Sequence, residues 1–244
     1  MIDALTATSA GMAGDVARLT TISQNLANAA TAGFKKELVV TRPFIDYLGR
    51  TANAGPSANF PVGSPRSESV TDHRAGMIKF TGNPLDIAIE DGGFFEVMTE
   101  QGPAYTRQGT FRLDVQGRLT TDAGLPVMGV SGELILTTSQ PRIDAAGKIF
   151  DGENQLGQIK LVRFEDPRSL EHAGGGLYLA GPGSTTRSDG YDRMRQGHTE
   201  TSNVNSMTEM VKMIETMRHF ESSQRVIQAY DGMLDKTIRT LGEF

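Results

Sequence analysis

Both ends of the chain carry apolar residues in alternating steps of three and four, and this spacing is the strongest constraint on the fold. Near the N-terminus the apolar members of the series are Ile2, Leu5, Met12, Val16, Leu19 and Leu26. Ser9 and Ser23 occupy the remaining positions of the same series. Such steps place side chains on one stripe of an α-helix and are typical of a coiled-coil seam. The spacing predicts a helix over about residues 2–28, with Gly33 as its stop signal.

The same spacing near the C-terminus predicts a second, longer helix over about residues 206–241. Its apolar members are Met210, Met213, Met217, Phe220, Ile227, Leu234, Ile238 and Leu241. Ser206 and Glu209 have the spacing of a capping box, in which each side chain satisfies a free backbone N–H. Gln224 and Asp231 interrupt the series, as polar residues do when they fix the register between paired helices.

Two interpretations of these helices stay open. Each helix could pack on the core of its own domain, or the two could pair with each other and with other copies of the chain. The apolar face of the C-terminal helix is wider than a simple surface helix needs, because Val211, Ile214 and Val226 form a second apolar row. The width and the polar interruptions favour pairing.

The middle of the chain changes to the alternating pattern of β-strands. Phe111, Leu113 and Val115 alternate with polar residues, and Gln116-Gly117 then breaks the run, which predicts a hairpin. Residues 134–136 predict a further short strand. The chain contains 28 glycines and 10 prolines, which suits many short strands joined by turns. An all-β domain over residues 76–200 follows.

The resulting architecture is α+β, with N- and C-terminal helices pairing as a coiled-coil-like inner layer and an all-β domain inserted between them. The expected divisions are an N-terminal helical segment at 1–34, an extended arm at 35–75, a β-rich outer domain at 76–200 and a C-terminal helix at 201–244. Four prolines among Gly, Ser, Thr, Asn and Ala set the arm apart in composition.

The sequence offers little for catalysis or metal binding. It has no cysteine, and its four histidines, His73, His172, His198 and His219, lie too far apart for a metal-binding spacing. Each is expected to be a surface histidine. We therefore expect no enzyme activity, catalytic residue, cofactor or metal. The net charge of −5 argues against nucleic acid as a partner, and the lack of an 18-residue apolar run argues against membrane insertion. The N-terminus lacks the basic start and apolar core of a cleaved signal peptide.

Four motifs, in order along the chain, resemble those of the bacterial flagellar rod and hook axial proteins. The first runs from Asn25 to Lys35 and contains Asn25, Leu26, Asn28, Gly33 and Phe34. The second is Gly82–Ile89 with Gly92–Phe95, and the third is Tyr105–Phe111. The fourth is Glu200–Asn205 and contains Asn203, Val204 and Asn205. The asparagines have side chains that suit the backbone groups at helix ends.

That resemblance implies a structural subunit of the flagellar basal-body rod, the hollow drive shaft that transmits torque and passes exported subunits. The terminal helices would form its inner layer in a helical assembly. Partners would be other copies of the chain, neighbouring rod proteins and the flagellar type III export apparatus. The location would be the periplasmic rod, reached without a cleaved signal peptide. Phe44 and Leu48 have the spacing of an export-gate motif found in some family members.

Within the family the resemblance is closest to the F-type of the proximal rod, because the chain is short, with the G-type of the distal rod as the alternative. An interpretation from another class also stays open. A periplasmic β-domain with helical extensions could be a glycan-binding protein or an enzyme. That interpretation requires a polar cleft with clustered carboxylates.

Overall fold

The computed structural model describes residues 2–41, 67–181, 184–187 and 193–242, which fall into two compact units. Unit 1 combines Met1–Ala27, Glu37–Val70 and Asn205–Phe244, and unit 2 combines Asn28–Lys36 and Thr71–Val204. The candidate export-gate residues Phe44 and Leu48 lie outside the described residues. So do the side chains of Ile2, Leu5, Leu234, Ile238 and Leu241, whose backbones belong to helices.

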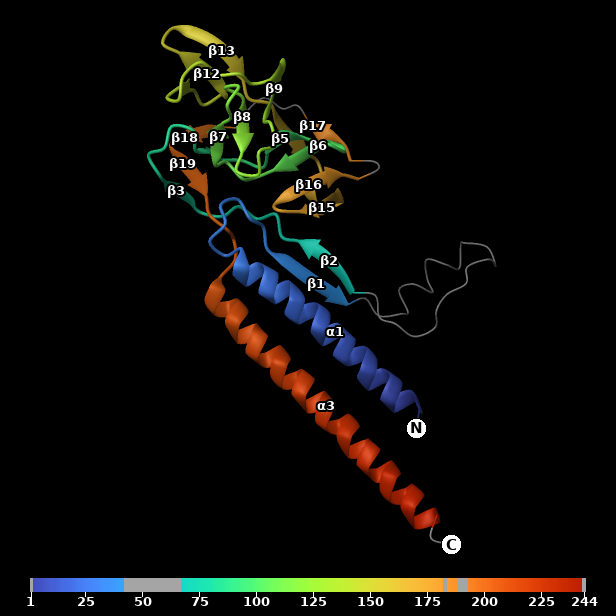
Figure 1. The fold of residues 1–244 in the computed structure, drawn as a ribbon. Coiled ribbons are helices and arrows are strands. Elements are labelled where there is room, and N and C mark those ends of the chain that lie inside the picture. Colours follow the sequence, from blue (N-terminus) through green and yellow to red (C-terminus); the bar gives the residue numbers. More distant parts are fainter. Residues whose placement is uncertain (1, 42–66, 182–183, 188–192, 243–244) are drawn as a thin grey trace, which may run out of the picture. The chain divides into compact units, whose positions relative to one another are not determined.

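Unit 1 is built on two long helices, α1 (Ile2–Ala27) and α3 (Ser206–Gly242). They lie side by side and run in opposite directions (Figure 1). These bounds confirm the helices predicted over residues 2–28 and 206–241. With 26 and 37 residues and a rise of 1.5 Å per residue, α1 is about 39 Å long and α3 about 55 Å.

The helix ends differ in detail from the sequence-based expectation. Asn205, rather than Ser206, caps α3, because its Oδ1 accepts a hydrogen bond from the Thr208 N–H at 3.1 Å. Gly33 does not stop α1, which ends earlier, at Ala27. Gly33 instead adopts a φ of 68° where a Cβ would lie 2.3 Å from the carbonyl oxygen of Arg107 in unit 2. A close backbone approach therefore explains the glycine.

The segment predicted as an extended arm begins and ends in paired strand. β1 (Glu37–Thr41) and β2 (Ser67–Thr71) form a two-stranded sheet, and β1 also packs against α1 in unit 1. The Ser69 hydroxyl donates to Glu37 Oε2 at 3.0 Å, which joins the two strands through side chains.

Unit 2 is an antiparallel β-domain, which agrees with the all-β expectation for the middle of the chain. Its largest sheet has six strands in the order β15-β16-β6-β5-β14-β17. The strands before residue 135 are β3 (Ile78–Phe80), β4 (Ile87–Ile89), β5 (Phe94–Thr99), β6 (Gly102–Thr106), β7 (Phe111–Leu113), β8 (Leu119–Thr121), β9 (Met128–Gly129) and β10 (Gly132–Glu133). The later elements are β11 (Arg142–Ile143), β12 (Lys148–Asp151), β13 (Asn154–Gln158), β14 (Leu161–Phe164), η1 (Pro167–Ser169), β15 (Leu170–Gly174), β16 (Leu177–Ala180), β17 (Thr186–Arg187), β18 (Met194–Gln196) and β19 (His198–Glu200).

The predicted hairpin is confirmed, and one predicted strand is wrong. β7 pairs with β8 in the register Phe111↔Thr121, and Gly117 supplies a φ of 78° at the turn. Residues 134–136 form no regular strand, because only Ile135 makes a bridge, to Arg118. Two backbone hydrogen bonds flank this single bridge, from the Leu136 N–H to the Gly117 carbonyl oxygen at 2.8 Å and from the Leu119 N–H to the Leu134 carbonyl oxygen at 2.9 Å.

Two adjacent residues of β5 belong to two different hydrophobic clusters. Phe95 enters a cluster with Ile87, Leu119 and Ile149. Its neighbour Phe94 enters a second cluster, whose other members are Tyr105, Val162, Phe164, Leu170 and Tyr178. Successive strand side chains point to opposite faces, so one short strand anchors both faces of its sheet.

We predict that Phe95→Ala destabilises the β-domain by about 3–5 kcal/mol. Phe95 is fully buried and meets the ring of Phe111 edge-on, with centroids 5.0 Å apart, so truncation leaves a cavity. Urea denaturation followed by circular dichroism measures the loss. Val115→Ala is the matched control, since Val115 is 97% exposed and its truncation should change stability by less than about 0.5 kcal/mol. Equal midpoints for both variants would contradict the prediction.

Candidate assembly interface

Asn25 ties the end of α1 to the first strand within unit 1. It is 1% exposed, and its amide nitrogen donates to the Glu37 carbonyl oxygen at 2.7 Å. Its Oδ1 accepts from the Glu37 N–H at 2.9 Å. The buried amide thus pairs with both backbone groups of one strand residue, as a neighbouring strand would.

In unit 2, Asn203 likewise hydrogen-bonds backbone groups through its side-chain amide. Its Oδ1 accepts from the Lys36 N–H at 2.7 Å, and its amide nitrogen donates to the carbonyl oxygens of Asp72 and Arg74 at 2.8 and 3.1 Å. Of the four motif asparagines, Asn205 caps a helix as the sequence suggests. Asn28 accepts from the Thr31 hydroxyl in a local turn. Leu26 and Val204 are half-buried, and Phe34 is buried.

Three charged residues, one from each of three family motifs, meet inside unit 2. The Glu200 carboxylate contacts the Lys35 ammonium through Oε1 and the Arg107 guanidinium through Oε2, the latter at 3.4 Å. All three side chains are almost fully buried. Lys35 also donates to the Arg74 carbonyl oxygen at 2.9 Å, and the Gly76 N–H donates to Glu200 Oε1 at 2.7 Å. We call Lys35, Arg107 and Glu200 the buried charge cluster.

Burial sets the electrostatics of this cluster. It lowers the pKa of the Lys35 ammonium below its usual value, although the Glu200 carboxylate acts in the opposite direction. Sequence reasoning missed the cluster, because Lys35 and Glu200 are 165 positions apart. The sequence signal that could have pointed to the cluster is that Lys35, Arg107 and Glu200 each lie in a family motif.

His73 lies beside the cluster rather than on the surface, so that expectation is wrong for it. Its ring meets those of Phe94 and Tyr178 edge-on, with centroids 5.8 and 5.3 Å apart. Burial, reinforced by the positive charges of Lys35 and Arg107, lowers the pKa of His73 to about 4. His73 is therefore neutral near pH 7. Of the other three histidines, His172 and His219 are exposed and His198 is half-buried.

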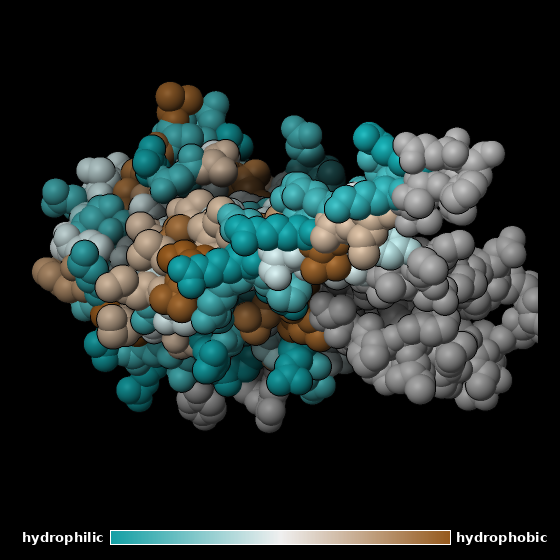
Figure 2. Space-filling view, turned by 90° about the horizontal axis from the view of Figure 1, so that it is seen from below, coloured by the Kyte–Doolittle hydropathy of each residue, from teal (hydrophilic) through white to brown (hydrophobic). Residues whose placement is uncertain are grey.

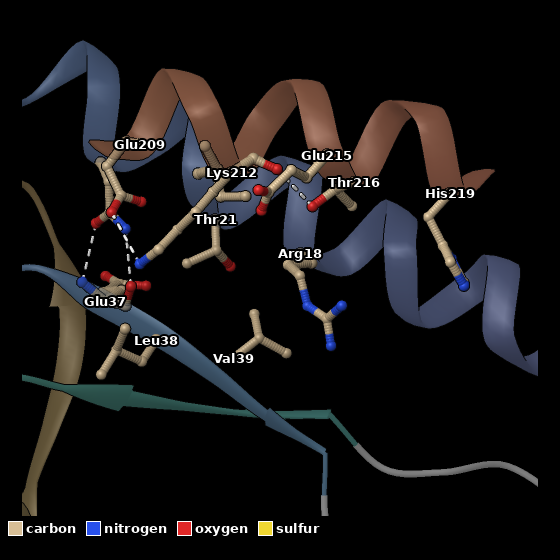
Figure 3. A pocket seen from close by; sticks show the side chains of 12 residues that line it. Arg18, Thr21, Glu37, Leu38, Val39, Glu209, Lys212, Glu215, Thr216 and His219 are labelled. Carbon is tan, nitrogen blue, oxygen red and sulfur yellow. Dashed lines mark hydrogen bonds and ion pairs between the residues drawn. The ribbon is translucent and has the colours of Figure 1, made fainter. Parts of the chain in front are cut away.

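In unit 1, α1 and α3 bury polar side chains as well as the apolar Ile22. Asp15, Thr216 and Glu209 are all buried, and Asp15 Oδ2 contacts His219 Nδ1 at 2.5 Å. A cavity of about 470 Å³ opens between the two helices and β1 (Figure 3). Its lining includes the cationic Arg18 and Lys212 and the anionic residues Glu37, Glu209 and Glu215.

The predicted seam residues divide between half-buried and exposed positions. The half-buried ones are Met12, Leu19, Leu26, Met213, Phe220 and Ile227. Val16, Met210 and Met217 are exposed in the single chain. Further exposed apolar residues on α3 include Met207, Val211 and Ile214. Figure 2 shows separate apolar residues among polar ones on one face of the molecule.

Neither a metal-binding group nor a membrane-spanning helix occurs among the described residues. Within those ranges no group of three or more His, Asp or Glu side chains could hold a metal ion. None of the described helices combines the length and apolar content that a membrane span needs.

Comparison with known proteins identifies the class. A family model described as "Flagellar basal body rod FlgEFG protein C-terminal" matches residues 195–240. Another, "Flagellar hook protein FlgE/F/G D1 domain", matches residues 88–152. Thus the α3 region matches a rod-protein module and part of the β-domain matches a hook and rod module.

Full-length relatives extend this match to nearly the whole chain. The flagellar basal-body rod protein FlgG of Borreliella burgdorferi is 35% identical over 96% of this chain and 97% of its own length. FlgG of Bacillus subtilis is 31% identical over 93% of this chain and 95% of its own length. FlgF of Caulobacter vibrioides is 30% identical over 91% of both. The chain belongs to the family of flagellar basal-body rod proteins.

We predict that Glu200→Gln destabilises the protein by about 3–5 kcal/mol, because it leaves the buried Lys35 and Arg107 charges without their carboxylate. The amide can still accept from the Gly76 N–H, so the loss reports on charge. Urea denaturation measures it, with Glu153→Gln as the matched control at an exposed position. A Glu200→Gln midpoint equal to that of the control would contradict the prediction.

We also predict that His73 makes stability depend on pH between about 6.5 and 4. The folded pKa is about 4 and the ordinary value is 6.5, so the unfolded chain binds a proton first. Stability present above pH 6.5 is lost as the pH falls to 4. The loss is about 1–2 kcal/mol after allowing for solvent screening of the half-buried ring. His73→Leu should remove this slope in a series of urea denaturations, whereas His172→Leu should keep it. An unchanged slope in His73→Leu would refute the assignment.

Proposed function

We propose that this chain is a structural subunit of the flagellar basal-body rod that assembles helically, through α1 and α3, with further copies and with neighbouring rod proteins. Membership of the flagellar basal-body rod family supports the proposal that the chain is a rod subunit. The exposed apolar residues of α3 carry the argument for the helices, because five of them lie within the first 12 residues of α3 and all five are exposed in the single chain. Self-assembly would bury them.

In this proposal, α1 and α3 form a coiled-coil-like inner layer, built from residues 1–34 and 201–244. Residues 76–200 form the outer domain and residues 35–75 an arm between the layers. Each Met, Ile or Val buried on assembly contributes about 1.5–3 kcal/mol before ordering costs. Several such residues per subunit are enough to couple the ordering of the helices to assembly.

Alignment length supports the F-type of the proximal rod over the G-type of the distal rod. The alignment with FlgF of Caulobacter vibrioides has 227 positions and covers 91% of this chain. About five of those positions are therefore gaps in this chain. The alignment with FlgG of Bacillus subtilis has 257 positions and covers 93% of this chain. About 30 of those positions are therefore gaps in this chain. The FlgG proteins thus carry insertions that this chain lacks. Both types match at similar identity, so length is the argument.

The proposal includes a route and a location. The subunit would leave the cytosol through the flagellar type III export apparatus without a cleaved signal peptide, and reach the periplasmic rod. Phe44 and Leu48 are the candidate export-gate residues. The role is structural, and we assign no catalytic step, cofactor, metal, nucleic acid or membrane insertion to it. The rod family supports this role over a periplasmic enzyme or glycan-binding protein.

We predict that Met217→Asp abolishes swimming while the β-domain stays folded. A charge on the exposed apolar part of α3 would oppose burial in the rod, and Met217 belongs to unit 1 whereas the β-domain is unit 2. Leu26→Asp, in the first family motif, should have the same effect. Motility on soft agar and circular dichroism of the purified protein give the two readouts. Ser222→Asp is the control, because Ser222 is exposed on a polar part of α3. Normal swimming of Met217→Asp cells would overturn the proposed role of α3.

A further inference from the structure

His73 belongs to a short stretch of unit 2 that other parts of the chain hold in place. The Asn203 amide nitrogen donates to the carbonyl oxygens of the two neighbouring residues, Asp72 and Arg74, at 2.8 and 3.1 Å. The Lys35 ammonium also donates to the Arg74 carbonyl oxygen, at 2.9 Å. Both residues adjacent to His73 are thus fixed through their backbones, and this fixes the place of the imidazole ring.

Further hydrogen bonds join the same stretches of the chain. The Asp72 N–H donates to the Lys36 carbonyl oxygen at 2.8 Å. The Lys36 N–H donates to Asn203 Oδ1 at 2.7 Å. Residues 35–36, 72–74 and 203 therefore form one hydrogen-bonded group, which we call the latch.

The latch lies where the chain passes between the two units. Unit 2 consists of Asn28–Lys36 and Thr71–Val204, so the chain passes between units at four points. These points are before residue 28, after residue 36, before residue 71 and after residue 204. The last three lie next to residues of the latch. The latch therefore joins three of the four passages to one another.

The His73 ring connects the latch to the largest sheet. It meets the rings of Phe94 on β5 and Tyr178 on β16 edge-on, with centroids 5.8 and 5.3 Å apart. Its Nδ1 is buried and has no hydrogen-bond partner among the residues that the structure describes. A protonated imidazole carries an N–H at both nitrogens, so a proton taken up by His73 would leave a buried donor without an acceptor.

The cations that face His73 also oppose its protonation. Lys35 and Arg107 both act on the ring with positive charge. The Glu200 carboxylate already binds both of these cations. A protonated His73 would therefore be a third cation beside one buried carboxylate, which is an arrangement that burial penalises strongly.

The nearby carboxylates are engaged elsewhere. Asp72 binds the exposed Arg74 guanidinium, and Asp166 Oδ1 accepts from the Arg168 N–H at 3.0 Å. On β15, the His172 ring lies 5.5 Å from that of Tyr178 and would itself add positive charge in acid. The sum of these effects with burial lowers the pKa of His73 to about 4.

We propose that His73 is an acid-operated release for the latch. When the ring takes up a proton, it leaves its place against Phe94 and Tyr178, and residues 72–74 come away from Asn203 and Lys35. The inference concerns the folded chain alone and does not depend on the proposed rod function.

The direction of the effect follows from the two protonation states. The pKa of His73 is about 4 in the closed latch and about 6.5 in an exposed ring. The closed latch is therefore fully favoured above pH 6.5 and loses stability as the pH falls toward 4. Between pH 7 and pH 5 the equilibrium shifts toward the open latch by about 10-fold, after allowance for the partial exposure of the ring.

Release of the latch would leave both hydrophobic clusters of unit 2 in place. Neither cluster includes a residue of 28–36, 71–76 or 200–204. Opening gives up the backbone hydrogen bonds of residues 72–74 and the ring contacts of His73. A local opening that exposes little apolar surface costs less free energy than global unfolding. The latch can thus open while β5 and β16 keep their neighbouring strands.

Amide hydrogen exchange of the full-length chain, measured by NMR at pH 7 and pH 5, tests the latch. The Asp72 N–H reports on the latch. The Val127 N–H, which donates to the Leu119 carbonyl oxygen at 2.8 Å, reports on the core. After correction for the effect of pH on the intrinsic exchange rate, we expect the protection factor of Asp72 to fall about 10-fold from pH 7 to pH 5. It should lie well below that of Val127 at both pH values, because the latch opens without global unfolding.

Two variants assign the effect to His73. His73→Leu should remove the pH dependence at Asp72, since leucine keeps an apolar contact with the sheet and takes up no proton. His172→Leu is the matched control and should retain it, because His172 is exposed. If His73→Leu fails to fold, an NMR titration of the wild-type chain replaces it. The His73 ring signal and the Asp72 amide signal should then change together below pH 6.5.

Several results would overturn the latch. Equal protection of Asp72 and Val127 at both pH values would mean that His73 acts on global stability alone. Protection of Asp72 that does not change with pH, or that changes equally in His73→Leu, would remove His73 as the release. In the titration, an Asp72 amide signal that stays constant while the His73 ring titrates would have the same meaning. None of these results bears on the rod function, which the swimming of Met217→Asp cells tests separately.

Discussion

The buried charge cluster is the interaction on which the rest of unit 2 depends. Glu200 receives both Lys35 and Arg107, and the Gly33 N–H donates to the Glu200 carbonyl oxygen at 2.7 Å. The cluster thus holds together the stretch that follows α1 in sequence and the stretch that leads toward α3. Charges buried this deeply are stable only as a complete set. One carboxylate therefore secures both segments through which the chain enters and leaves the β-domain.

Sequence reasoning predicted the elements well and the contacts between them poorly. The three-and-four spacing gave both helices, and the alternation around Gly117 gave a hairpin, because both patterns depend on local geometry. The buried charge cluster could not be predicted, since Lys35 and Glu200 are 165 positions apart and meet only in the folded chain. Periodicity also shows that a helix has an apolar face without showing what covers it. Met210 and Met217 are on that face, yet the single chain leaves them exposed.

Two motif asparagines, the buried Asn25 and the half-buried Asn203, show how short motifs determine structure. Asn25 pairs with the backbone of Glu37 in unit 1, and Asn203 binds the backbone at Lys36, Asp72 and Arg74 in unit 2. An amide offers both a donor and an acceptor, so it can satisfy backbone groups where no regular strand reaches them. Aspartate lacks the donor and leucine lacks both. This requirement explains the residue type at each position without any catalytic role.

The polar side chains between α1 and α3 have a consequence for the free energy that holds these two helices together. Asp15, Thr216 and Glu209 regain water when the helices separate, so parting them costs less free energy than opening an apolar zipper of the same length. The same buried polar groups therefore make the helix pair of unit 1 easier to separate in water than a purely apolar seam would be.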